Sequence, residues 1–210
     1  MFNLDQFKEN NFVIKMCKAE DLDRIDVNCV VKKYQAGQKC KDILRNAQTV
    51  IVIGSVITKE MDIVKKGILA DDFPCYKASR VKANEISKAL KHHGFSATAT
   101  TAVSIKNACV LAGIGVYGKN ALIINPEYGT MLRYCVVLTD WKPNAYDEPL
   151  SNFNPCSGCE ECIKACKSGC LVPYAVDGLK CYCTYIEKGM KLLQTYPMCS
   201  DCQDVCKYNK

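Results

Sequence analysis

The sequence predicts an α/β sandwich domain with a mixed sheet, followed by a small metal-binding unit. Two observations predict the domain: a short apolar run rich in β-branched residues, and the alternation of strand-like and helix-like patterns after it. A third predicts the metal-binding unit, because ten of the 16 cysteines lie beyond residue 150. We therefore expect residues 1–150 to form the α/β domain and residues 151–210 to form the cysteine-rich unit.

Residues 49–54 are continuously apolar and end in glycine, which is typical of a strand that is buried on both faces. Residues 76–93 place their apolar side chains at helical spacing before Gly94, which predicts an amphipathic helix with a glycine cap. Further along, the patterns predict in turn a strand, a helix, a strand and its hairpin partner, at residues 95–101, 103–112, 121–125 and 133–139. After Trp141, scattered prolines interrupt all periodicity and indicate a boundary.

Composition excludes several classes of protein. With 49% hydrophobic and 24% charged residues, the chain is neither disordered nor collagen-like. No stretch reaches the run of about eighteen apolar residues that a membrane-spanning helix needs, and the first ten residues mix charge into every turn. We therefore expect no membrane partner and a cytoplasmic location. The net charge is +6, but the sequence contains no basic stripe, so the charge pattern neither indicates nor excludes a polyanion such as tRNA, which we treat as a doubtful partner.

The cysteine spacing is the most specific signal in the chain. The first run is C-x2-C-x2-C-x3-C from Cys156 to Cys166, and a second run from Cys199 to Cys206 repeats its C-x2-C-x3-C portion. Such spacing places three thiolates around one cubane and directs the last cysteine of the run to the neighbouring cluster. The sequence therefore predicts two [4Fe–4S] clusters in a module like that of two-cluster bacterial ferredoxins.

Crossed ligation assigns four cysteines to each cluster. One cluster takes Cys156, Cys159, Cys162 and Cys206, and the other takes Cys166, Cys181, Cys199 and Cys202. Cys183 is the alternative to Cys181, and Cys170 is a spare thiol. Structural zinc is the competing interpretation, but a zinc site needs only two C-x2-C pairs and does not use the third regularly spaced cysteine.

A G-x-G-x-x-G pattern at Gly113, Gly115 and Gly118 invites a nucleotide-binding interpretation. The dinucleotide fingerprint requires a strand before the glycines and a helix after them. The patterns here predict the reverse order, so we expect a tight turn at which the backbone closely approaches another segment.

The order of these motifs resembles the epoxyqueuosine reductase family and its relatives, the reductive dehalogenases. The matching residues run from Ala112 through the glycine turn to Gly129, then through Val137–Leu–Thr–Asp140 to the cysteine runs. The resemblance implies a cobalamin-binding α/β domain whose corrinoid receives electrons from a double-cubane module. It also implies a low-potential electron donor of the ferredoxin or flavodoxin type. The family's catalytic aspartate corresponds to Ala99 here.

From this resemblance we expect a pocket for the corrin ring that faces the first cluster, with contacts from Lys106, Tyr117, Lys119 and Asn120. Ordinary alternatives remain for each residue: a packed aromatic for Tyr117, solvated amines for the two lysines and a turn former for Asn120. Two functions stay open: a corrinoid-dependent reductase of an unidentified substrate, and a non-catalytic electron-transfer or corrinoid-handling protein. Ala99 favours the second function, and the retention of a large α/β domain favours the first.

Overall fold

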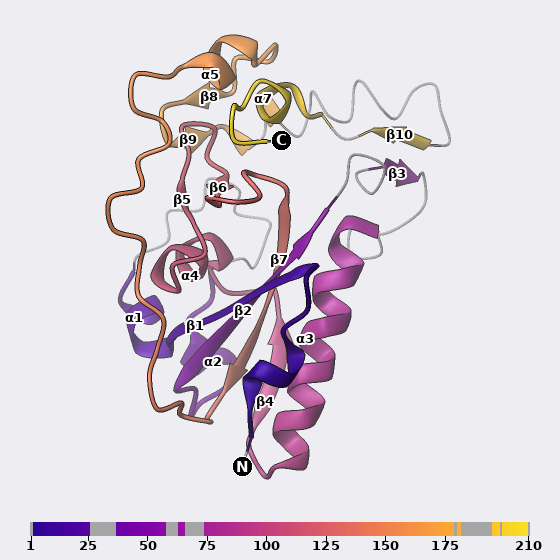
Figure 1. Ribbon diagram of the computed structural model, residues 1–210, viewed down its shortest axis with the longest axis vertical. Coiled ribbons are helices and arrows are strands. Elements are labelled where there is room, and N and C mark those ends of the chain that lie inside the picture. The colour runs from indigo at the N-terminus through magenta and orange to yellow at the C-terminus, as the bar shows by residue number, and fades with distance from the viewer. Residues whose placement is uncertain are drawn as a thin grey trace.

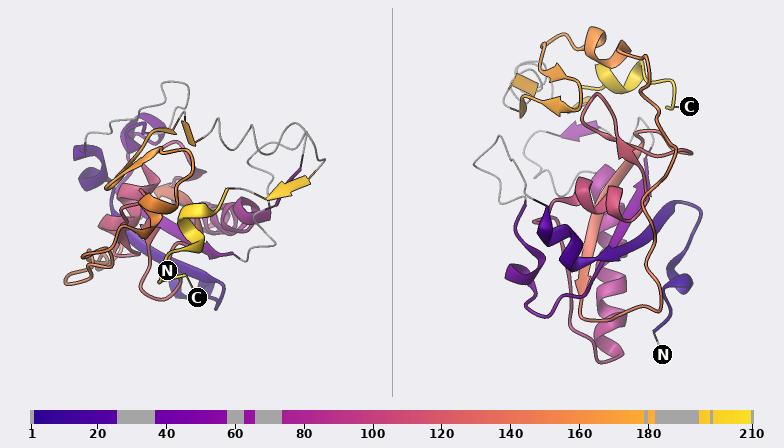
Figure 2. Two further views of the ribbon diagram at one scale, coloured as in Figure 1. Left: turned by 90° about the horizontal axis from the view of Figure 1, so that it is seen from above. Right: turned by 90° about the vertical axis from the view of Figure 1, so that its left-hand side faces the viewer.

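The α/β part of the chain carries the cysteine-rich part on one end, as Figure 1 and the two views of Figure 2 show. This computed structural model describes residues 2–25, 37–57, 63–65, 74–178, 180–181, 195–197 and 199–209. The N-terminus lies at the opposite end of the molecule from the cysteine-rich part (Figure 1).

A four-stranded sheet in the order β1-β2-β7-β4 forms the centre of the α/β part. Its strands are β1 (Phe12–Lys18), β2 (Thr49–Val56), β7 (Leu132–Thr139) and β4 (Ala97–Thr100). The α/β class is confirmed, but every pair in this sheet is antiparallel, so the prediction of a mixed sheet is wrong for the described strands. Antiparallel neighbours do not need the helical crossovers that parallel strands require.

The sheet is buried on both faces, which explains the continuous apolar run in β2. Val50 and Val52 face the core beneath α4 (Ile105–Leu111). Ile51 and Ile53 face a second core beneath α3 (Pro74–His92), which also contains Ile86 and Leu90. The predicted helix over residues 76–93 is therefore confirmed, and Gly94 follows it at φ +85°.

The predicted hairpin between residues 121–125 and 133–139 does not form, so this prediction is wrong. The turn itself forms, with a bridge between Asn125 and Gly129. However, β6 (Ile123–Ile124) pairs with β5 (Val116–Tyr117), while β7 pairs with β2 and β4. The strand from Leu132 to Thr139 is apolar on both faces. Burial at the centre of the sheet therefore stabilises it more than pairing with a two-residue strand would.

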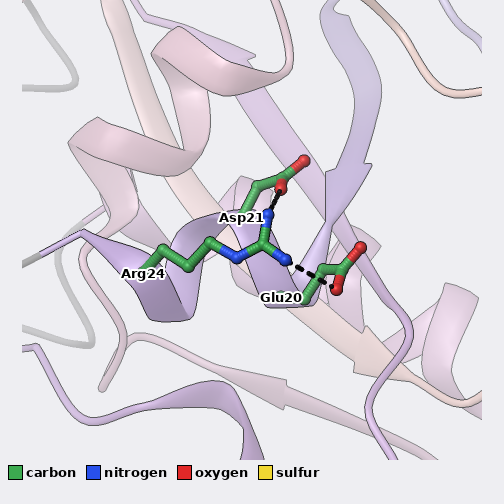
Figure 3. Close-up of polar contacts among 3 residues, drawn as sticks. All are labelled: Glu20, Asp21 and Arg24. Atoms are coloured by element: carbon green, nitrogen blue, oxygen red, sulfur yellow. Dashed lines mark hydrogen bonds and ion pairs between the residues drawn. The ribbon is translucent and has the colours of Figure 1, made fainter.

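Three short elements complete the N-terminal part: η1 (Leu4–Phe7), α1 (Ala19–Arg24) and α2 (Cys40–Ile43). In α1 the guanidinium of Arg24 reaches Glu20 at 3.3 Å and Asp21 at 3.2 Å (Figure 3). The side chain of Arg24 is 71% exposed, so these ion pairs add little to stability.

The cysteine-rich part contains α5 (Glu161–Ala165), α7 (Asp201–Asp204) and a small hairpin of β8 (Leu171–Val172) and β9 (Ala175–Val176). A further pair joins β10 (Thr195–Pro197) to β3 (Ile63–Lys65). Within the described residues, we find no helix with the length and apolar character needed to cross a membrane.

The glycine-rich segment is a structural turn. It follows α4 and leads into β5, which confirms the predicted order of helix before strand. Gly113 has φ +63°, and a Cβ at this residue would collide with the backbone carbonyl of Glu148. A Cβ on Gly115 would collide with the carbonyl of Ile124. Glycine is needed at both positions because two backbone segments approach each other.

We predict that Gly115→Ala lowers the free energy of unfolding by about 1–3 kcal/mol, because the new methyl group forces β5 and β6 apart. Chemical denaturation measures this loss. Val81→Ala is the control, since Val81 is 57% exposed, and it should change stability by less than about 0.5 kcal/mol. Equal stability of Gly115→Ala and the unmodified protein would contradict the close approach.

Candidate functional site

The described cysteines of the C-terminal part fall into two groups. The first group surrounds a small hollow of about 20 Å³, lined by Cys156, Cys159, Cys162 and Cys206. The turn before α5 contributes the first two, α5 the third, and the segment after α7 the fourth. These are the four cysteines that crossed ligation assigns to one cluster.

The second group lines a larger cavity of about 410 Å³ and consists of Cys166, Cys170, Cys181, Cys199 and Cys202. It contains the four cysteines assigned to the other cluster, together with Cys170. The Sγ atoms of Cys166 and Cys170 lie 3.4 Å apart. Sequence reasoning left Cys170 as a spare thiol, and its place in this group follows from the hairpin of β8 and β9. Cys183 lies outside the described residues.

The donor chemistry of both groups fits iron–sulfur clusters, because such clusters are bound by four thiolates and the groups offer four and five thiols. Within the described ranges, no three His, Cys, Asp or Glu side chains converge closely enough to hold a single metal ion. The assignment of these cysteines to iron–sulfur clusters therefore rests on which residues are present and on how they are grouped.

Burial and hydrogen bonding act in opposite directions on these thiols. Burial raises the pKa of Cys202 to about 12, with a further contribution from neighbouring thiols such as Cys199. Burial also raises the pKa of Cys166, but hydrogen bonds from Ser168, Cys170 and nearby backbone N–H groups outweigh it and bring the pKa to about 7. The thiolate is the form that binds metal, and these hydrogen bonds favour the thiolate of Cys166.

The larger cavity lies between the α/β domain and the second cysteine group. Its domain side is mostly apolar and is lined by Ile105, Leu122, Ile123 and Leu132. Two predicted contact residues also line it: Lys106 and Asn120. The Lys106 amine donates to the carbonyl of Ala121 at 2.7 Å, and burial lowers the pKa of this amine.

Asn120 lies between the two cysteine groups, because it lines both the cavity and the small hollow. It is 4% exposed, and its Oδ1 accepts a hydrogen bond from the backbone N–H of Leu122 at 3.2 Å. Asn120 therefore stabilises a turn, and it also lies beside both predicted cluster sites.

The other two predicted contact residues do not line the larger cavity. The hydroxyl of Tyr117 donates to Oδ1 of Asn107 at 2.8 Å. Lys119 lies beside the first cysteine group, where its backbone N–H donates to the Sγ of Cys156 at 3.4 Å. We expected the pocket to face the first cluster. The larger cavity instead faces the second cysteine group.

Sequence reasoning missed Tyr134, which lines the cavity from β7. Its hydroxyl is buried and has no hydrogen-bond partner among the described residues. Gly54 offered a partial signal, because a glycine inside an apolar strand often marks a close approach, but the sequence does not reveal which residue lies opposite. Ala99 lies in β4 opposite Val137 and does not line the cavity.

Comparison with known sequences links the chain to one kind of enzyme. No protein-family model matches it. The epoxyqueuosine reductase of Listeria monocytogenes is 35% identical over 108 residues, which cover 47% of this chain and 28% of that protein. The epoxyqueuosine reductase of Pseudomonas aeruginosa is 28% identical over 168 residues, which cover 73% of this chain and 45% of that protein. The chain thus matches less than half the length of these curated relatives.

Solved structures agree in fold. An epoxyqueuosine reductase crystallised with an epoxyqueuosine-modified tRNA-Tyr stem loop matches with a TM-score of 0.72 at 20% identity, covering 98% of this chain and 63% of that one. A reductive dehalogenase, described with a mechanism for B12-dependent dehalogenation, matches with a TM-score of 0.67 at 19% identity, covering 94% of this chain and 30% of that one. The chain therefore resembles the epoxyqueuosine reductases in sequence, and it shares its fold with them and with the reductive dehalogenases.

Proposed function

We propose that this protein is an iron–sulfur reductase that binds two [4Fe–4S] clusters and uses a corrinoid to reduce a small molecule. The observation that carries the proposal is the grouping of the cysteines: one set of four surrounds a hollow, and the other forms a wall of the cavity. A group bound in the rest of that cavity would lie directly beside the cluster that the second set of thiols holds.

The relatives support the reductase part of the proposal. Curated sequences with 28–35% identity are named epoxyqueuosine reductase, and a structure of the same fold is described with B12-dependent dehalogenation. Since the chain covers only part of each relative, the activity is a proposal for this chain.

In this proposal Cys156, Cys159, Cys162 and Cys206 hold one cluster. Cys166, Cys181, Cys199 and Cys202 hold the other. Bound there, such clusters supply single electrons at low potential. Asn120 is buried between the two groups, and apolar side chains line the side of the cavity opposite the thiols.

Lys106 and Asn120 are the residues that would contact a corrinoid in the cavity, because both line it. Lys119 would support the first cluster, through the bond from its backbone N–H to Cys156. Tyr117 would act indirectly, by fixing Asn107 on α4. The reductant we propose is a ferredoxin-type or flavodoxin-type protein. One solved relative was crystallised with a tRNA stem loop, and the substrate that we propose for this chain is a small molecule.

The alternative is a protein that passes electrons or handles a corrinoid without catalysis. The observation that favours it is Ala99, which supplies no acid and lies outside the cavity wall. Turnover of a reducible substrate by the reduced protein distinguishes the two functions, since only the reductase consumes substrate.

We predict that anaerobically purified protein contains about eight iron atoms and about eight acid-labile sulfides per chain. Cys202→Ser should remove about half of the iron, because it deletes one ligand of one cluster. Cys170→Ser is the matched control in the same cavity wall and should retain the full iron content. Metal analysis and low-temperature electron paramagnetic resonance measure both variants. Colourless protein containing zinc in place of iron would refute the cluster proposal.

We also predict that the iron-loaded protein shifts the absorption spectrum of cob(II)alamin to that of a base-off corrinoid. Lys106→Met should weaken this binding by about 3- to 10-fold, because one hydrogen-bond donor to the ligand is lost. Lys164→Met is the control, since the side chain of Lys164 is 68% exposed on α5. If the spectrum does not change at all, electron transfer without a corrinoid is the better description.

A further inference from the structure

The loop that follows α5 places two side chains within hydrogen-bond distance of one thiol of the second cysteine group. The hydroxyl of Ser168 lies 3.3 Å from the Sγ of Cys166, and the Sγ of Cys170 lies 3.4 Å from it. Gly169 stands between these two residues at φ +60°, and its backbone N–H donates to the carbonyl of Cys166 at 3.0 Å. The chain turns back on itself here, so both side chains reach the same sulfur.

The fold holds Cys170 in this place. Cys170 is 5% exposed, and its backbone carbonyl accepts a hydrogen bond from the N–H of Asp177 at 2.8 Å, where β9 ends. Its thiol also forms a hydrogen bond with Cys181. The Cys170 thiol thus lies next to two sulfurs, those of Cys166 and Cys181, which the proposed function assigns to the second cluster.

The direction of these hydrogen bonds follows from the chemistry of a cluster ligand. A cysteine that binds a cluster is a thiolate, which has no proton and can only accept. The hydroxyl of Ser168 and the thiol of Cys170 are then the donors. Hydrogen bonds to the ligating sulfurs are among the factors that set the reduction potential of a cluster, because they stabilise the added negative charge of its reduced form.

The first cysteine group differs in this respect. Within the described part of the chain, no side-chain hydroxyl or spare thiol forms a hydrogen bond with its four cysteines, and Cys156 accepts from the backbone N–H of Lys119 at 3.4 Å. Donation by Ser168 and Cys170 therefore acts on the second group alone. The first cluster provides an internal reference for measuring their effect.

We propose that Ser168 and Cys170 are positioning residues that raise the reduction potential of the second cluster, by donating hydrogen bonds to its ligand sulfurs. This inference rests on the proposed function, because it takes the second group to hold a [4Fe–4S] cluster. A higher potential there favours the movement of one electron from the first cluster, which is oxidised, to the second, which is reduced. The electron then lies beside the larger cavity.

The test is a redox titration of anaerobically purified, iron-loaded protein, followed by low-temperature electron paramagnetic resonance. The unmodified protein should give two midpoint potentials. We expect Ser168→Ala to lower one of them and to leave the other unchanged. The shift corresponds to a roughly 2- to 5-fold change in the equilibrium constant for one-electron reduction, or about 20–40 mV. Cys170→Ala should lower the same midpoint.

Three further variants separate hydrogen bonding from a general effect of substitution. Cys170→Ser keeps a proton donor and should shift the midpoint less than Cys170→Ala. Ser157→Ala is the matched control and should leave both midpoints unchanged, because Ser157 is exposed and forms no hydrogen bond with a thiol among the described residues. Cys159→Ser removes a ligand of the first cluster, and in this variant Ser168→Ala should still lower the remaining midpoint.

An unchanged midpoint in Ser168→Ala or in Cys170→Ala would overturn the role of that residue. A shift that disappears in the Cys159→Ser variant would overturn both roles, because the first cluster would then be the one affected. Loss of iron from Cys170→Ala would overturn the role of Cys170, which would then be a ligand itself.

Iron content and cob(II)alamin binding separate these outcomes from failure of the proposed function. Protein without any [4Fe–4S] cluster would refute both proposals. Protein with two clusters and the expected shifts, but without cob(II)alamin binding, would refute the corrinoid-dependent reductase and leave this inference intact. Protein that has two clusters and binds cob(II)alamin, but whose midpoints do not change in the variants, would refute this inference alone.

Discussion

The contact between Thr130 and the last residues of the chain holds the cysteine-rich part against the α/β domain. Gln203 Nε2 donates to the Thr130 hydroxyl at 3.0 Å, and the backbone N–H of Thr130 donates to Asn209 Oδ1 at 2.7 Å. Thr130 is 3% exposed and Gln203 8%, so these hydrogen bonds are shielded from water. Both residues also line the cavity, which therefore depends on this contact for its shape.

The same contact explains why Gly129 precedes Thr130. Gly129 has φ +55°, and a Cβ at this position would collide with the backbone of Tyr208. The turn from Asn125 to Gly129 therefore closes on itself through the bridge between these two residues, and it also packs against the C-terminal segment. This turn thus helps to couple the domain to the cysteine-rich part, and the cavity lies between an apolar wall and a wall of thiols.

Features that depend on local sequence were predictable. The apolar run of β2, the amphipathic α3 and the order of helix, glycine turn and strand all follow from periodicity and from glycine's conformational freedom. The strand pairing was not predictable, because β7 is apolar on both faces and its sequence suits an edge hairpin as well as a central position. Its actual neighbours depend on how much surface each arrangement buries.

For the candidate site, the sequence by itself determined which thiols are available and how they are spaced, and it predicted eight of them as cluster ligands, because residue identity and spacing are local properties of the chain. Only the tertiary structure decided which side chains share the cavity. It brought Tyr134 and Lys106 to the second cysteine group and left Tyr117 outside the cavity wall. These positions depend on strand register and on the docking at Thr130, which join residues more than 70 positions apart in the sequence.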